Sequence, residues 1–389
     1  MGLENIGIIF KIEKSIWANS IIEQRVGLLD GLSGFILFYD SMNVAFPDQG
    51  FEEKLIAIIE KTNALIEENQ NSVNLSSGIA GYGLALLRLY NKNVDIDQEY
   101  FESIDSILLE DFELHCNANE YDYMHEAMGI AMYFIERYKK HKNDNIIAIL
   151  NKFSTSFIEK INLDFKNVLI KKDEDRGDYY SLGLAHGAAS YLNFLIYLKT
   201  HFSELSIDIS KALQVCVDFL YKYKEYDNQS KQFYTNFIPL GDNRAIPSRM
   251  SWCQGDLGVS NALYNTGIYL NDNIIIDEAI DLMNNSSKID FENSGVNDFG
   301  FCHGSAGILV QFYLASKKYQ IDYDFQINSW LETLKKQTND FEDFLWYDNS
   351  TNQYRPESNL LEGAIGLGLV LLTIENKIDL NWLETFNLH

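Results

Sequence analysis

The chain has 389 residues, of which 46% are hydrophobic and 22% are charged, with a formal net charge of −25 at pH 7. This composition predicts a folded protein with a sizeable core, and its negative charge argues against nucleic acid or an anionic membrane face as a partner. An acidic surface suits a cationic peptide, although it is also common on soluble proteins. Four cysteines in a chain of this length do not form a disulfide scaffold, which favours a reducing compartment.

The N-terminal segment indicates no export signal. Residues 1–5 lack a basic region followed by an apolar core and a cleavage site. Ile6 stands where a myristoylation signal would have Ser or Thr. The longest apolar run, residues 363–374, is too short to cross a bilayer. We therefore expect a cytoplasmic protein that does not itself span the membrane.

One pattern recurs along the chain: a Gly-x-x-Gly turn followed by a run of small and aliphatic residues. The turns, two of them imperfect, begin at Gly31, Gly78, Glu126, Gly187, Gly255, Gly304 and Gly363. The apolar runs after them predict helices that are buried on most sides. Between the turns, stretches such as 51–68 and 207–223 place apolar residues three and four apart among charges, which is typical of outer amphipathic helices.

Each interval between turns can hold one outer and one inner helix. We therefore predict an all-α protein, an α/α toroid in which about seven inner and about seven outer helices close into a double ring, and we treat residues 1–389 as a single domain. An open α-solenoid would also pair helices, but a ring brings the turns together around a common cavity. Two longer intervals, near residues 168–172 and 232–239, predict short strands or hairpins.

Two of the turns carry cysteines. Cys253 precedes the turn at 255–258, and Cys302 with His303 directly precedes the turn at 304–307. Two thiolates and an imidazole suit zinc, and a set of only three protein ligands leaves an open position, as in catalytic zinc sites. We predict that Cys253, Cys302 and His303 bind Zn²⁺; the alternative is a pair of inert core cysteines.

These segments resemble the lanthionine synthetase C-like family, the cyclases of lantibiotic biosynthesis. The matching segments are residues 183–187 (GLAHG), 252–258 (WCQGDLG), 302–307 (CHGSAG) and 361–366 (LEGAIG). With the earlier turns they cover essentially the whole chain in the family's order. The resemblance implies an α/α toroid with zinc held by Cys253, Cys302 and His303. It also implies intramolecular Michael-type addition of peptide cysteine thiols to dehydroalanine or dehydrobutyrine.

The resemblance implies three further site residues: Asp122, His186 and Arg249. Asp122 stands where the family has an acidic residue near the metal, His186 matches its active-site histidine, and Arg249 matches an arginine that points into the site. Arg249 could stabilise an enolate, His186 is the best general acid, and Asp122 could orient His186 or relay the thiol proton. The roles of His186 and Asp122 could also be exchanged. Each residue also has a structural alternative: His186 could be a core histidine, Arg249 could be solvated or ion-paired, and Asp122 could cap the following helix.

The sequence departs from the family pattern at three places. Gln254 replaces an aromatic residue, Ser190 replaces a glycine, and His125 with Glu126 stands where a small residue and a glycine are usual. The expected ligands are untouched, but substrate contacts and proton transfer are affected.

Other candidate residues are read as structural. Cys116 and His115 lie off the repeat turns, and Cys216 lies in an amphipathic stretch. We expect Glu362, in the last turn, to be a buried partner of backbone amides or of an arginine.

The sequence therefore predicts a free-standing zinc-dependent lanthionine cyclase, an enzyme that forms carbon–sulfur bonds in a dehydrated precursor peptide. A separate dehydratase would prepare that peptide, and a membrane transporter is a further expected partner through which the protein could associate peripherally with the membrane. One alternative is a zinc-containing enzyme that acts on glutathione or another electrophile. Another is a non-catalytic, zinc-stabilised toroid that binds peptides.

Overall fold

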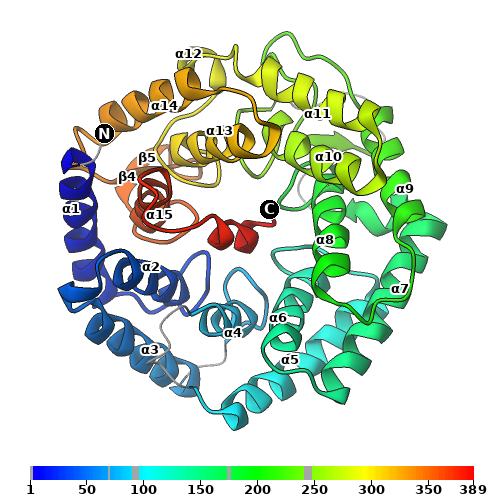
Figure 1. Cartoon of the computed structure of the whole chain (residues 1–389), viewed down its shortest axis with the longest axis horizontal. Helices are drawn as coiled ribbons and strands as arrows, with labels where there is room; N and C mark the ends of the chain where they lie inside the picture. Colours follow the sequence, from blue (N-terminus) through cyan, green and yellow to red (C-terminus); the bar gives the residue numbers. More distant parts are fainter. Residues whose placement is uncertain (1–2, 69–70, 90–95, 173–176, 241–247) are drawn as a thin grey trace.

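The computed structural model describes residues 3–68, 71–89, 96–172, 177–240 and 248–389. Within these residues almost all regular structure is helical, and the long helices alternate between an outer and an inner ring (Figure 1). The inner helices are α2 (Leu32–Ala45), α4 (Ile79–Leu87), α6 (Ala127–Lys140), α8 (Ala188–His201), α10 (Asp256–Leu270), α13 (Ser305–Tyr319) and α15 (Ala364–Ile374). The outer helices are α1 (Leu3–Ser20), α3 (Phe51–Glu68), α5 (Gln98–Ala118), α7 (Asp144–Leu169), α9 (Ser210–Lys222), α11 (Asn273–Ser286) and α14 (Asp324–Gln337). This is the predicted all-α toroid.

The inner ring is closed. Each inner helix contacts the next one along the chain, and α15 contacts α2. The closed ring excludes the open solenoid, in which the first and last repeats lie apart.

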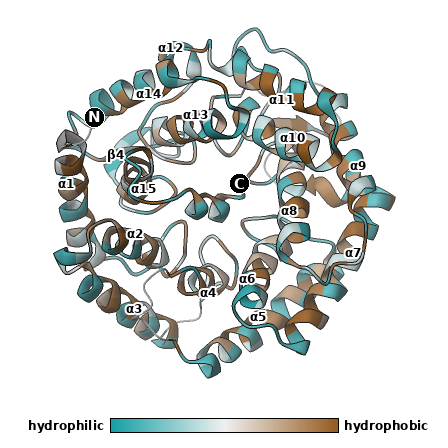
Figure 2. Cartoon of the chain, viewed as in Figure 1, coloured by the Kyte–Doolittle hydropathy of each residue, from teal (hydrophilic) through white to brown (hydrophobic). Residues whose placement is uncertain are grey.

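The two rings differ in burial as their sequences predict. Every residue of α4 is buried, whereas α3 buries only Phe51, Leu55, Ile58, Thr62 and Leu65. These five recur at intervals of three and four residues, so they line the inward face of α3. Figure 2 shows hydrophilic and hydrophobic residues alternating along the helices of the rim. The remaining helical elements within the described residues are short: η1 (Pro47–Gln49), α12 (Phe291–Ser294) and η2 (Asn381–Phe386).

Strands occupy both of the longer intervals. β1 (Ile170–Lys171) and β3 (Phe237–Pro239) lie where short strands were expected, and both pair antiparallel with β2 (Tyr179–Ser181). Tyr180 faces Ile170 on one side and Ile238 on the other. The β4–β5 hairpin (Leu345–Asp348 and Gln353–Pro356) was not predicted, because it lies outside the two longest intervals between turns.

The turns before the inner helices form a belt of backbone hydrogen bonds that runs around one end of the ring. Each donor lies in one turn and each acceptor in a neighbouring turn. The bonds run from Ala185 N to Cys253 O, Trp252 N to Cys302 O, Cys302 N to Leu361 O, Leu361 N to Leu29 O, Leu29 N to Ser76 O, and Ser76 N to Met124 O. This turn belt fixes the turns relative to one another.

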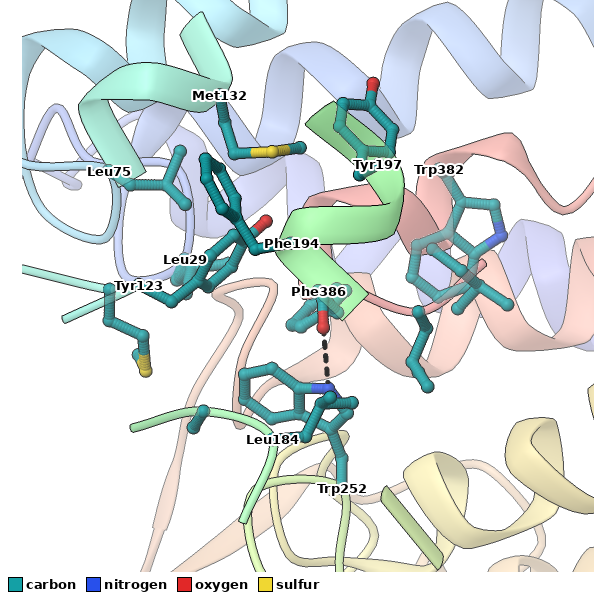
Figure 3. Packing of buried hydrophobic residues seen from close by; sticks show 14 of the residues in the cluster. Leu29, Leu75, Tyr123, Met132, Leu184, Phe194, Tyr197, Trp252, Trp382 and Phe386 are labelled. Carbon is teal, nitrogen blue, oxygen red and sulfur yellow. Dashed lines mark hydrogen bonds between the residues drawn. The ribbon is translucent and has the colours of Figure 1, made fainter. Parts of the chain in front are cut away.

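The end of the chain lies in the middle of the ring (Figure 1). Trp252 Nε1 donates to Phe386 O at 2.9 Å, among buried side chains from several turns (Figure 3). The Phe386 ring stacks on Phe301 with centroids 3.9 Å apart, and Tyr123 donates its hydroxyl to Thr385 O. The turns therefore pack on Thr385 and Phe386 and do not surround an open central channel. We call this packed layer the floor.

Candidate metal centre and the neighbouring histidine cluster

Cys253 and Cys302 are brought together by the backbone of their turns. Trp252 N and Cys253 N donate to Cys302 O at 2.9 and 3.4 Å, which lays the turn before α10 against the turn before α13. Gly255 has a φ of +82°, and a Cβ there would lie 2.4 Å from Gln232 Oε1. Glycine is therefore required for the chain to leave Cys253 and enter α10.

The donor atoms of Cys253, Cys302 and His303 all lie within 4.8 Å of one another. Both cysteines are 9% exposed. His303 Nε2 is buried and has no hydrogen-bond partner among the residues that the structure describes, a costly state for a polar atom. Two thiols and an imidazole that converge in this way fit a zinc ion in donor type and in number.

Neighbouring groups shape the electrostatics of this trio. A hydrogen bond from Cys302 lowers the pKa of Cys253 well below its usual range against the opposing effect of burial, and His303 lowers it further. Hydrogen bonding with Cys253 and burial raise the pKa of Cys302, while Arg249 acts in the opposite direction. Arg249 is half-buried on the segment leading into the turn. Its positive charge therefore acts on Cys302. We call Cys253, Cys302 and His303 together the metal-type group.

Glu362 also faces this group. Burial raises the pKa of its carboxyl to about 7, and His303 acts in the opposite direction. The sequence predicts a buried partner of backbone amides or of an arginine, and the structure brings Glu362 within electrostatic range of Cys253 and His303.

A second cluster lies on the turns before α6 and α8. Asp122 is 3% exposed. Its Oδ2 accepts from His186 Nδ1 at 2.7 Å and lies 3.0 Å from Lys171 Nζ, while its Oδ1 accepts from Met124 N and His125 N. Burial alone would raise the pKa of Asp122, but His186 and Lys171 hold it well below its usual range. Asp122 is therefore a buried carboxylate that these two partners keep in its charged form.

His125 and His186 stack on each other, with ring centroids 5.6 Å apart and planes inclined by 25°. Burial alone would lower the pKa of His186, but Asp122 raises it above its usual value. For His125, desolvation lowers the pKa. The stacked pair therefore favours a protonated His186 beside a neutral His125.

Sequence reasoning missed Lys171 altogether. It lies on β1, and its side chain is 16% exposed and reaches both Asp122 and Glu126. Nothing in the two consecutive lysines, Lys171 and Lys172, indicates this role, because it depends on the pairing of β1 with β2. His125 was noticed only as a departure from a pattern.

The two clusters are neighbours. Ala185 N donates to Cys253 O at 3.3 Å. A Cβ on Gly183 would lie 2.1 Å from the same oxygen, so only glycine allows this approach. The structure thus brings the predicted residues onto adjacent turns, with Asp122 and His186 in a group of their own beside the three proposed ligands.

The other two cysteines lie away from the site, and two residues that depart from the family pattern, Ser190 and Gln254, make structural hydrogen bonds. Cys216 is fully buried in α9, and Cys116 lies on α5. Ser190 Oγ accepts from Asn387 Nδ2 at 3.1 Å, so the serine that replaces a family glycine holds the end of the chain. Gln254 N donates to Ser251 Oγ at 3.1 Å.

Comparison with known proteins identifies the family. The family model described as "Lanthionine synthetase C-like protein" matches residues 23–387. The chain belongs to this family. A solved structure titled "Nisin cyclase" is similar, with a TM-score of 0.73 and 21% identity over 97% of this chain and 96% of that one. At this identity the likeness confirms the α/α toroid. No curated protein sequence matches at a significant level. Within the part of the chain that the structure describes, no helix has the length and apolarity needed to cross a membrane.

Proposed function

We propose that the protein is a zinc-dependent lanthionine cyclase that adds cysteine thiols of a dehydrated precursor peptide to dehydroalanine or dehydrobutyrine. The observation that carries this proposal is the convergence of Cys253, Cys302 and His303 within 4.8 Å, beside the Asp122–His186 pair, in a member of the lanthionine synthetase C-like family. We propose that residues 1–389 act as one domain.

The chain's own residues account for the movement of charge and protons. Zinc held by Cys253, Cys302 and His303 would act as a Lewis acid that favours the deprotonated form of a thiol. His186 is fixed through Nδ1 by Asp122, so its Nε2 is left to donate a proton to the α-carbon. Arg249 contributes a fixed positive charge, which stabilises the negative charge of an enolate.

The reaction also implies partners. Dehydroalanine and dehydrobutyrine arise by removal of water from serine and threonine, so a separate dehydratase must act before this enzyme. We propose a cytoplasmic location, with a membrane transporter as a further partner in a peripheral complex.

The proposal is tested with purified, zinc-loaded protein and a dehydrated precursor peptide. Free thiols should disappear while the mass of the peptide stays constant, since addition is an isomerisation. A Cys302→Ala variant with an unchanged helical circular dichroism spectrum should not consume thiols above the uncatalysed rate. An unchanged thiol titre with wild-type protein contradicts the proposal, and collapse of the Cys302→Ala variant favours the zinc-stabilised scaffold.

A further inference from the structure

The proposed addition involves two proton transfers, and the Asp122 cluster contains two imidazoles. A thiol must lose its proton before it attacks, and the α-carbon must gain one afterwards. His186 suits the second transfer. His125 is accessible to solvent although its neighbours desolvate part of its ring, and its ring nitrogen lies within 4.8 Å of the ligand atoms of both Asp122 and His186.

Asp122 positions both histidines at once. Its Oδ2 accepts from the ring of His186, and its Oδ1 accepts from the backbone N of His125 at 3.0 Å. The rings stack at 5.6 Å. A change in the charge of one ring is therefore felt directly by the other.

The same three side chains, Asp122, His125 and His186, have the spacing of a metal site. Two observations favour protons over a metal ion. The Lys171 ammonium lies 3.0 Å from Asp122 Oδ2, where a cation would have to bind. Moreover, Asp122 already receives two backbone N–H groups, the His186 ring and Lys171, which uses about four acceptor positions of a carboxylate.

The charges of the cluster then define how many protons it holds. Asp122 and Glu126 contribute two negative charges, and Lys171 contributes one positive charge between them. A single additional proton on the imidazole pair makes the cluster neutral. Among the described residues, Cys253, beside His186, and Tyr191 also face the cluster. The Tyr191 hydroxyl donates to Val168 O, and burial raises its pKa.

We propose that His125 is a second catalytic residue, which accepts the thiol proton while His186 delivers a proton to the α-carbon. This inference rests on the proposed function. The S–H bond breaks and its proton goes to His125; the sulfur forms a bond to the β-carbon, the C=C electron pair moves into the enolate, and the enolate takes its α-proton from His186. Water returns the proton from His125 to His186, so the pair carries one proton before and after turnover, and no proton is gained or lost.

The lowered pKa of His125 agrees with this assignment, because a base must be neutral at working pH. Desolvation is the main cause, His186 and Lys171 lower the pKa further, and Asp122 and Glu126 act in the opposite direction. Lys171 is thus a positioning residue that keeps His125 able to accept a proton.

The first test replaces His125 by asparagine, which cannot titrate. The probe is a synthetic peptide with one dehydroalanine and one cysteine, added to zinc-loaded protein, with the uncatalysed rate subtracted. We expect His125→Asn to lower kcat by about a hundredfold with little change in KM, and to remove the acidic limb of the pH profile. The matched control is His141→Asn, an exposed histidine after α6, which should keep the wild-type rate.

A second variant keeps the inference testable if His125→Asn does not fold. Lys171→Met removes the positive charge that lowers the pKa of His125, so His125 gains its proton at a higher pH. The acidic limb of the kcat profile should move to higher pH, and activity should return as pH rises. A purely structural role for Lys171 predicts a loss that pH does not restore.

The outcomes separate the two proposals. If wild type is active and Cys302→Ala is not, but His125→Asn stays within about twofold of wild type, well short of the effect of a general base, the role of His125 is overturned and the cyclase stands. An unshifted acidic limb in Lys171→Met overturns it as well. If wild type shows no rate above background while mass spectrometry confirms bound zinc and an intact peptide, the cyclase proposal fails, and the proton relay fails with it.

Discussion

The two clusters on the turn belt are built in different ways. The Cys253–Cys302 pair lies on turns joined by main-chain hydrogen bonds, from Trp252 N and Cys253 N to Cys302 O. Between the turns before α6 and α8, the bond that joins Asp122 to His186 is made by side chains. Lys171, from a strand outside the helical rings, completes the second cluster.

The two clusters should therefore respond differently to the substitution of a side chain. Backbone bonds survive the exchange of a side chain, so the metal-type group can lose a ligand and keep its geometry. The histidine cluster depends on the side chains themselves, since removal of one partner leaves a buried charge uncompensated.

Replacing Cys302 by serine should have the largest effect on activity and a small effect on folding. We expect the cyclisation rate to fall by more than about a hundredfold, beyond what partners outside the ligand shell contribute, because serine is a poor zinc ligand. The melting temperature of the metal-free protein should change little, since Cys302 O and not Sγ joins the turns. Elemental analysis and calorimetry check both. Stoichiometric zinc in the variant contradicts the proposed ligand set.

Replacing Asp122 by asparagine should destabilise the protein by about 3 to 5 kcal/mol at pH 7, because Lys171 and His186 lose their shared anion. The pKa of Asp122 is depressed in the folded protein. The stability that it contributes is therefore present above the unfolded pKa, about 4, and is lost as pH falls toward the folded pKa. Urea unfolding of both proteins from pH 3 to pH 7 should show their difference shrinking below about pH 4. A difference independent of pH contradicts this account.

Replacing Phe386 by alanine tests the floor beneath the metal-type group. The ring stacks on Phe301 and meets the edge of Trp252, so its loss should cost about 3 to 5 kcal/mol in urea unfolding. Zinc should also bind more weakly, because both turns rest on this ring. The matched control is Phe325→Ala on α14, where the side chain is 79% exposed and the change should stay within about 0.5 kcal/mol. Equal losses in the two variants argue against a packed floor.

Replacing Gly183 by alanine tests the contact between the clusters. The new Cβ would meet Cys253 O at 2.1 Å, so the turns must separate, at a cost of about 1 to 3 kcal/mol. Hydrogen exchange at Ala185 N–H should become faster. Gly7→Ala on α1 is the control: no atom of the described residues lies within 4 Å of its Cβ, and the helix should gain up to about 1 kcal/mol. Unchanged exchange at Ala185 shows that the contact is dispensable.

Local patterns predicted the helices well. The outer helix read from residues 51–68 is α3, with the same bounds, because its apolar spacing follows the helix period directly. The convergence of Cys253, Cys302 and His303 was also predicted, since each lies beside a repeat turn and the repeat places those turns at one end of the ring. The metal itself and the roles of Asp122, His186 and Arg249 stay predictions.

These local patterns could not predict contacts between segments that are far apart in the sequence. The position of Lys171 depends on β1 pairing with β2, and the floor depends on Phe386 meeting Trp252 from a distant part of the chain. In the sequence His125 is only an unusual residue in a turn, and the stacking of its ring on His186 depends on the fold.

The amino-acid sequence by itself determined the alternation of inner and outer helices and the proposed zinc ligands. Helix period and glycine turns act over a few residues, so they can be read along the chain. Only the tertiary structure decided which side chains surround Asp122, how the turns bond to one another and what fills the ring. Those contacts join residues far apart in sequence, and their energies depend on distances that no local pattern contains.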